Sequence, residues 1–178
     1  VLGDRKGFFI RDLFKSKVSL LILLAGFSWT IASPAHAFIR VQEKESKEAN
    51  KLYEEGNYEE ALTRYETILE EHPDSYELVM NKANTLYKLG KYDEALAEYK
   101  KCSGAQKEEL LASSLYNKGN TLFRMGKMKE ALDYYKSSLK MNPADGDAKY
   151  NLEVTLKKMQ EQQEQKQKQE DRSQKSEK

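Results

Sequence analysis

Three glycines, Gly56, Gly90 and Gly126, mark the same point in three similar stretches of this 178-residue chain. They stand 34 and 36 residues apart, and several sequence columns agree when the stretches are aligned on them. Each glycine has a small residue seven positions before it, an aromatic residue three before it, an alanine five after it and a tyrosine nine after it. A period of this length predicts a chain built from one repeated supersecondary unit.

Each unit is predicted to contain two helices. Small and large apolar residues recur three or four positions apart on both sides of the glycine, which is the pattern of amphipathic helices. The glycine supplies the turn, so the two helices fold back as an antiparallel hairpin. Pro73 and Pro143 each stand 17 residues after a glycine and are expected to end the second helix. Asn57 and Asp74 are predicted N-caps, because an acidic residue follows each three positions later.

The composition excludes several kinds of site. Lys and Arg total 30 against 29 Asp and Glu, so the chain lacks the basic excess that indicates nucleic-acid binding. One Cys and two His cannot supply a zinc site or an internal disulfide. Cys102 is predicted to be a small packing residue, with a redox role as the alternative.

The repeated columns resemble those of the tetratricopeptide repeat, whose period is about 34 residues. The resemblance covers residues 42–156 and implies an all-α fold, a solenoid of three helix-turn-helix repeats with a C-terminal capping helix. The repeats are expected at about 42–75, 76–109 and 112–145 and the cap at 146–156, in a domain spanning 38–156. Repeat 2 lacks its closing proline and carries extra residues around Cys102-Ser103-Gly104, so its last turn is expected to be irregular.

The two ends of the chain differ from the repeats. A basic segment, 1–17, precedes an almost uncharged stretch, 18–31, and the small-x-small sequence Ala35-His36-Ala37. This order predicts a signal peptide, residues 1–37, and export to the periplasm; an uncleaved anchor facing the periplasm is the alternative. Residues 157–178 are rich in Gln, Glu and Lys and are predicted to form a solvated tail or a frayed helical extension, with a docking element as the alternative.

In tetratricopeptide arrays the first helix of each hairpin lines a concave groove, and the resemblance implies a binding surface there. The predicted groove residues are Asn50, Tyr53, Met80, Asn84, Tyr87, Lys88, Tyr116, Asn120, Phe123 and Arg124, with Glu54 in the same stripe. Asparagine amides pair with peptide backbone, and aromatic rings offer rigid apolar area. The groove is therefore predicted to bind an extended peptide or a partner helix; the convex face, the loops and self-association are the alternatives.

Chaperone-binding members of this family use a clamp of two Lys, two Asn and one Arg. Asn50 and Asn81 match the two asparagine positions of the clamp, but Ser46, Ser113 and Asn117 stand where its cations would be. Binding to a chaperone C-terminus is therefore not expected.

The sequence offers no catalytic set. The tripeptide His72-Pro73-Asp74 is that of J-domain co-chaperones, but it falls at the proline that ends a helix. No Ser/His/Asp or Cys/His arrangement can be assembled. We therefore expect a non-catalytic protein-binding scaffold with no cofactor, metal, nucleic-acid or small-molecule ligand. A periplasmic holdase chaperone or assembly factor is the alternative.

Residues 147–153 (DAKYNLE), running directly into the Gln/Glu/Lys-rich tail, resemble the end of the tetratricopeptide proteins of bacterial Bat (aerotolerance) operons. This resemblance implies an envelope complex concerned with stress tolerance. It also implies partners that are membrane proteins with von Willebrand factor A domains.

Overall fold

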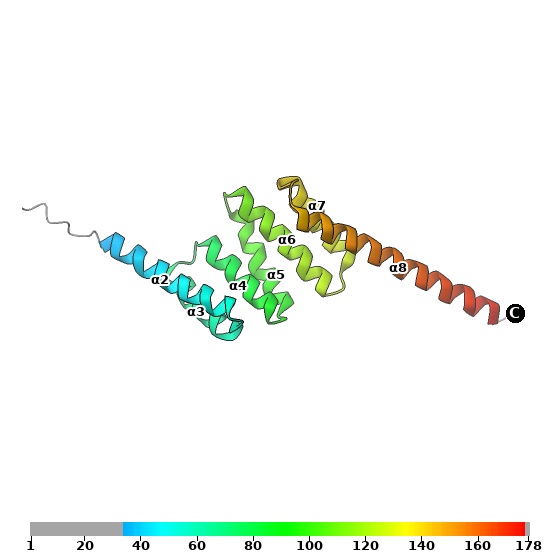
Figure 1. Ribbon diagram of the computed structural model, residues 1–178, viewed down its shortest axis with the longest axis horizontal. Coiled ribbons are helices and arrows are strands. Elements are labelled where there is room, and N and C mark those ends of the chain that lie inside the picture. The colour runs from blue at the N-terminus through cyan, green and yellow to red at the C-terminus, as the bar shows by residue number, and fades with distance from the viewer. Residues whose placement is uncertain (1–33, 177–178) are drawn as a thin grey trace, which may run out of the picture. The chain divides into compact units, whose positions relative to one another are not determined.

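A computed structural model describes residues 34–176, which are helical throughout apart from short turns and contain no strand. The helices are α2 (Pro34–Glu54), α3 (Tyr58–Glu71), α4 (Tyr76–Lys88), α5 (Tyr92–Lys101), the 3₁₀ turn η1 (Cys102–Gly104), α6 (Glu108–Arg124), α7 (Met128–Met141) and α8 (Gly146–Ser176), as Figure 1 shows. The predicted all-α fold of three helical hairpins and a capping helix is confirmed. Of the predicted signal peptide, only residues 34–37 are described, and they belong to α2.

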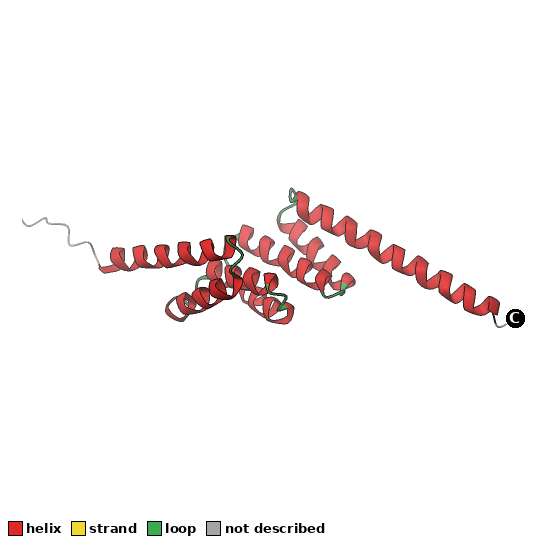
Figure 2. Cartoon of the chain, turned by 60° about the horizontal axis from the view of Figure 1, so that its bottom comes forward, coloured by secondary structure: helices red, strands yellow, loops and turns green. Residues whose placement is uncertain are grey.

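From Gln42 onward the described residues form one compact unit. Within it α4 packs against α5, and α6 packs against α7. In addition, α3 contacts α4, α5 contacts α6 and α7 contacts α8 (Figure 2). The hairpins are therefore stacked side by side in chain order. None of the helices described between residues 34 and 176 is both long and apolar enough to cross a membrane.

The turn inside each hairpin depends on its glycine. Gly56, Gly90 and Gly126 have φ angles of 84°, 75° and 78°, in the left-handed region that side chains with a Cβ avoid. In all three turns the N–H of the next residue donates to the carbonyl five positions before that residue, at 2.9 Å. This bond closes the end of the first helix and directs the chain back into the second.

Replacing Gly90 with alanine is expected to lower the free energy of unfolding by about 1–2 kcal/mol. A Cβ at Gly90 would meet no atom within 4 Å, so the whole cost comes from the backbone conformation. Gly146→Ala is the matched control, because a Cβ there also meets nothing within 4 Å but the residue begins a helix with an ordinary φ. Urea denaturation followed by circular dichroism measures both variants. Equal stability of the two would contradict the role given to the turn.

The predicted helix ends are partly confirmed. α3 and α7 end at Glu71 and Met141, shortly before the two prolines, and repeat 2 closes irregularly with η1. The cap predictions are less accurate. Asn57 occupies the N-cap of α3, but its side chain makes no capping bond. The prediction for Asp74 is wrong, because α4 starts one residue later and Ser75 Oγ accepts the capping bond from the Leu78 N–H at 3.4 Å.

The core lies between the two helices of each hairpin and between successive hairpins. The alanines on the two sides of the first two turns are fully buried, for example Ala83 and Ala95, which lets the helix backbones approach closely. Tyr65, Tyr99 and Tyr135 are each 1% exposed and fill the adjoining space. At Gly119 the backbone of α6 lies so close to α7 that an added Cβ would stand 2.5 Å from the Tyr135 ring.

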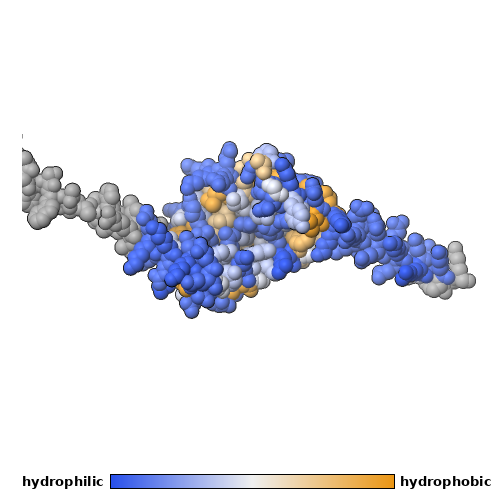
Figure 3. Space-filling view, viewed as in Figure 1, coloured by the Kyte–Doolittle hydropathy of each residue, from blue (hydrophilic) through white to orange (hydrophobic). Residues whose placement is uncertain are grey.

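The capping helix α8 is longer than predicted. Its first turn is capped by Asp145, whose Oδ1 accepts from the Ala148 N–H at 2.9 Å. Ala148 and Thr155 are fully buried, but residues 160–175 are all exposed. The helix nevertheless continues without a break past residue 156, and its distal half is hydrophilic on the face seen in Figure 3. Polar pairs one turn apart, such as Gln160 with Glu164 at 3.1 Å, support this exposed part.

Candidate binding groove

Three adjoining cavities follow the first helices of the hairpins and end at α8. We call them the α2–α4, α4–α6 and α6–α8 cavities, and their volumes are about 230, 230 and 340 Å³. The first two share Tyr53 and Asn84 in their walls, and the last two share Tyr87 and Asn120. Because neighbouring cavities share wall residues, the three adjoin in a row and together form one groove.

The groove contains nine of the ten side chains predicted for it. These are Asn50, Tyr53, Asn84, Tyr87, Lys88, Tyr116, Asn120, Phe123 and Arg124. The exception is Met80, which is 5% exposed and packs in the core cluster around Tyr99. Its flexible side chain fills the space between α4 and its neighbours, whereas Tyr116, in the same sequence column, reaches the groove.

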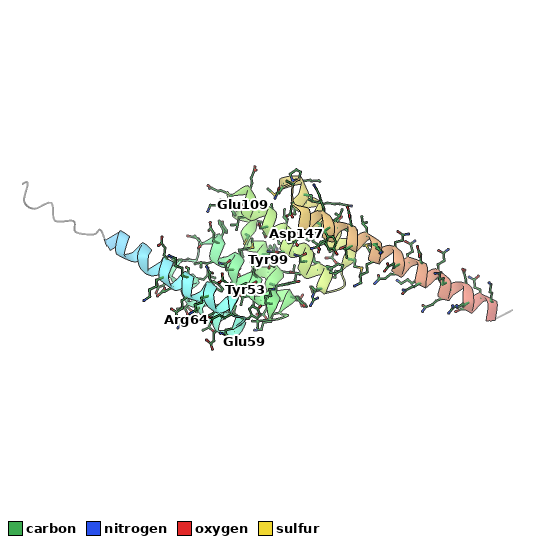
Figure 4. All side chains as sticks on the ribbon, viewed as in Figure 1. Tyr53, Glu59, Arg64, Tyr99, Glu109 and Asp147 are labelled. Carbon is green, nitrogen blue, oxygen red and sulfur yellow. The ribbon has the colours of Figure 1, made fainter. Side chains whose placement is uncertain are left out.

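A repeated hydrogen-bond network holds the groove asparagines in place. Asn84 Oδ1 accepts from the Tyr99 hydroxyl at 2.7 Å and from Asn117 Nδ2 of the next hairpin at 3.0 Å. The same two bonds are made at Asn50 by Tyr65 (2.6 Å) and Asn81 (3.2 Å), and at Asn120 by Tyr135 (2.9 Å) and Asn151 (2.9 Å). Figure 4 labels Tyr53 and Tyr99, which contribute to the α4–α6 cavity from α2 and α5.

This network leaves the amide nitrogens of the three asparagines for a ligand. Each Oδ1 already accepts two bonds, which uses both of its lone pairs. No described side chain accepts from Nδ2 of Asn50, Asn84 or Asn120. Asn50 is itself exposed, and among the described residues that are not exposed no buried side-chain N or O atom lacks a partner, so these three nitrogens are accessible to solvent. The groove floor therefore presents one set of free amide N–H donors for each repeat.

The tyrosines of the network stay protonated. Burial raises the pKa of Tyr65 to about 12 and also raises the pKa of Tyr99 and Tyr135 above the ordinary value. A neutral hydroxyl is the form that can donate to the asparagine oxygen. The orientation of the amides is therefore independent of pH across the physiological range.

Charge is distributed unequally along the groove. Glu54, Lys88 and Arg124 occupy the same sequence column in the three repeats, and all three are exposed. The Arg124 Nε donates to the Tyr92 hydroxyl at 3.4 Å, and Lys158 of α8 places its Nζ 5.1 Å from the centre of the Phe123 ring. The groove is thus acidic at the α2 end and basic from α4 to α8.

Family models agree with this architecture. One model described as a tetratricopeptide repeat matches residues 52–118, and a second with the same description matches residues 112–145. Together they cover residues 52–145, more than half of the chain. The chain belongs to the tetratricopeptide repeat (TPR) family. No curated protein sequence gives a match.

Solved TPR structures share the fold at low sequence identity. The TPR2AB domain of yeast Sti1 in complex with pHSP90 is 22% identical with a TM-score of 0.64, and the match covers 70% of this chain but only 49% of the Sti1 chain. The first TPR of Spaghetti (RPAP3), bound to the HSP90 peptide SRMEEVD, is 20% identical with a TM-score of 0.61, covering 66% and 92% of the two chains. The Sgt2 TPR domain from Aspergillus fumigatus is 20% identical with a TM-score of 0.62, covering 69% and 82%.

The groove of this TPR array also contains residues absent from the sequence-based groove prediction. They are Tyr65, Tyr99 and Tyr135 from the second helices, Asn81 and Asn117 from the first helices, and Asn151, Val154 and Thr155 from α8. Asn151 had a visible signal, because Tyr150-Asn151 repeats Tyr116-Asn117 one period later. The tyrosine nine residues after each glycine was also visible in the sequence as a column of the repeat.

Among the described residues, those considered for redox chemistry or metal binding are either buried or lie far from one another. Cys102 is a free, fully buried cysteine at the end of α5, and burial raises the pKa of its thiol. Its Sγ lies 3.8 Å from the Tyr76 carbonyl oxygen, as expected of a packed thiol. Over the described part of the chain, no three His, Cys, Asp or Glu side chains gather to hold a metal ion.

Proposed function

We propose that this protein is a non-catalytic scaffold that binds a segment of a partner protein in the TPR groove. The observation that carries the proposal is the row of free Nδ2 donors at Asn50, Asn84 and Asn120. An extended peptide presents backbone carbonyls at regular intervals, and amide N–H groups are suitable donors for them. The tyrosine and phenylalanine rings beside the donors supply apolar contact area for the partner's side chains.

The solved structures support peptide binding as a use of this fold. The Sti1 and Spaghetti TPR domains are seen in complexes with pHSP90 and an HSP90 peptide. In this chain, however, Asn50 and Asn81 are hydrogen-bonded to each other at 3.2 Å. The positions of the clamp that carry Lys or Arg in chaperone-binding members hold Ser46, Ser113 and Asn117 in this chain. We therefore propose a peptide of a different class from the chaperone C-terminus.

The cellular setting belongs to the same proposal. The sequence of residues 1–37 supports export to the periplasm, and DAKYNLE at 147–153 supports a place in a Bat-type aerotolerance complex. The partners proposed on this basis are membrane proteins with von Willebrand factor A domains.

The test uses aspartate rather than alanine at the groove asparagines. Asn84→Asp with Asn120→Asp keeps the oxygen that the buried Tyr99 and Tyr135 hydroxyls need, but replaces the Nδ2 donors with a second oxygen. An aspartate there repels a partner carbonyl instead of bonding to it. We expect recovery of the partner to fall at least about tenfold, since each lost bond costs on the order of 1 kcal/mol before repulsion is added.

The measurement is affinity purification of the full-length, C-terminally tagged protein from gently solubilised envelopes, with mass spectrometry of the bound proteins. Asn57→Asp with Asn142→Asp is the matched control, because both residues are exposed and lie outside the groove. One or two stoichiometric partners that are lost only in the groove variant would support the scaffold. A diffuse set of unfolded clients bound equally by both variants would replace it with the holdase.

A further inference from the structure

A buried lysine outside the groove has no anionic partner among the described residues. Lys118 of α6 is 8% exposed and lines none of the three groove cavities. No described carboxylate forms an ion pair with it, and its neighbour on α7 is the Tyr134 ring, whose centre lies 5.6 Å from the lysine Nζ. The Nζ still reaches solvent, because no buried side-chain nitrogen of the described, non-exposed residues lacks a partner. A buried cation without an anion is costly to maintain.

The preceding hairpin shows which partner a lysine takes at this position. Lys82 stands eight residues before its glycine, as Lys118 does before Gly126. The Lys82 Nζ lies 3.1 Å from Oε1 of Glu66 on α3 and 3.5 Å from Oε1 of Glu98 on α5. The site at Lys82 is therefore complete within the chain, with two carboxylates around one ammonium.

At Lys118 other residues occupy both carboxylate columns. Glu66 stands ten residues after its glycine, and the same position of α5 is the exposed Lys100. Glu98 stands eight residues after its glycine, and the same position of α7 is Tyr134. Burial lowers the pKa of Lys118, and repulsion from Lys100 lowers it further. The two lysines thus form a cationic site between α5 and α7 that has no anion from the described chain.

From this comparison we infer that the second helices α5 and α7 form a binding site for a carboxylate of a partner protein, which pairs with Lys118 and Lys100. The carboxylate takes the place that Glu66 and Glu98 take at Lys82. A bond to the ammonium groups alone does not offset the cost of immobilising a free small carboxylate. An aspartate or glutamate on a protein segment adds contact area across the two helices, so a protein segment is the occupant. The site lies outside the groove, and the inference goes beyond the proposed function.

The first test supplies the missing carboxylate within the chain. Lys100→Glu restores the residue type found at Glu66 and is expected to raise the midpoint of thermal unfolding of the full-length protein by about 3 °C. Lys136→Glu is the matched control, because Lys136 is exposed in the same column of α7 and the residue 34 positions after Lys118 is Leu152, which has no charge. Equal midpoints of the two variants would overturn the inference.

The second test looks for the carboxylate in a ligand. Random dodecapeptides displayed on phage are selected against the full-length protein carrying Asn84→Asp and Asn120→Asp, which weaken binding in the groove. Fluorescence anisotropy then measures the selected peptides on this protein with Lys118→Met, Lys100→Glu or Lys136→Glu added. Methionine keeps an unbranched buried side chain without the charge, and thermal melts establish that each variant is folded.

The selected peptides are expected to be rich in Asp and Glu. Lys118→Met and Lys100→Glu are each expected to weaken their binding about tenfold, and Lys136→Glu to change it less than twofold. Peptides without acidic residues, peptides that bind all variants equally, or no peptides at all would overturn the inference and leave the groove proposal standing. Displacement of the peptides by sodium acetate, but not by sodium chloride at equal ionic strength, would assign the site to a small carboxylate and overturn the protein partner.

Discussion

Replacing Tyr99 with alanine is expected to remove a large part of the stability of the folded array. The side chain is 1% exposed and packs in the core cluster that joins the first and second hairpins. Truncation of a buried aromatic side chain to alanine costs about 3–5 kcal/mol, because it leaves a cavity. It also removes the hydroxyl that donates to Asn84 Oδ1 at 2.7 Å. The total stability of a domain is about 5–15 kcal/mol, so the variant is expected to lose a large fraction of it and to unfold at a much lower urea concentration.

Tyr150→Ala is the matched control for this prediction. Tyr150 is 67% exposed on α8, so the same truncation is expected to change the free energy of unfolding by less than about 0.5 kcal/mol. Urea denaturation followed by circular dichroism gives both values. Tyr99→Phe separates the two parts of the effect, since it keeps the ring and loses about 1 kcal/mol for the hydrogen bond. A small, equal effect of both alanine variants would contradict the central place given to Tyr99.

Ending the chain after Asp145 is expected to unfold the third hairpin or to make the protein aggregate. This truncation removes Leu152, which packs against Leu122 and Tyr135, and uncovers an apolar face of α7. It also removes the two bonds of Asn151, to Tyr116 at 3.0 Å and to Asn120 at 2.9 Å. Leu152 is partly buried, so it contributes less than the about 1.5–3 kcal/mol of a fully buried leucine, and each hydrogen bond contributes about 1 kcal/mol. The expected loss is therefore about 3 kcal/mol.

Ending the chain after Gln160 provides the comparison. Residues 161–175 are exposed, so their removal is expected to leave the midpoint of thermal unfolding unchanged within about 1 °C. Size-exclusion chromatography and thermal melts distinguish the two truncated proteins. If the shorter chain melts like the full chain, α8 is not a cap. If the protein that ends after Gln160 is destabilised as much as the one that ends after Asp145, the exposed part of α8 has a structural role.

The hairpins could be predicted from the sequence because their requirements are local and recur in every repeat. A left-handed turn needs glycine at Gly56, Gly90 and Gly126, and two closely packed helices need small residues at fixed distances from it. The groove asparagines could be placed for the same reason, since they occur once in each repeat on the first helix.

Other features depended on contacts between hairpins and were missed or misplaced. Met80 and Tyr116 share a column, but a flexible thioether fits the core at one site while a ring reaches the groove at the other. The bonds between Asn84, Tyr99 and Asn117 join three helices, so sequence spacing alone could not pair them. The continuation of α8 past residue 156 depends on helix propensity and polar pairs, which leave no apolar stripe to recognise.

The oxygen of each groove asparagine accepts two hydrogen bonds. These bonds also link ligand binding to the cooperativity with which the array unfolds. Asn84 joins a tyrosine of its own hairpin to an asparagine of the next, and the same arrangement recurs at Asn50 and Asn120. In a linear array these bonds contribute to nearest-neighbour coupling, which determines whether hairpins unfold singly or together. A partner that accepts from Nδ2 polarises the amide and strengthens the bonds at its oxygen. When a partner occupies the groove, the terminal hairpins are therefore expected to unfold less readily on their own, and the array is expected to unfold more cooperatively.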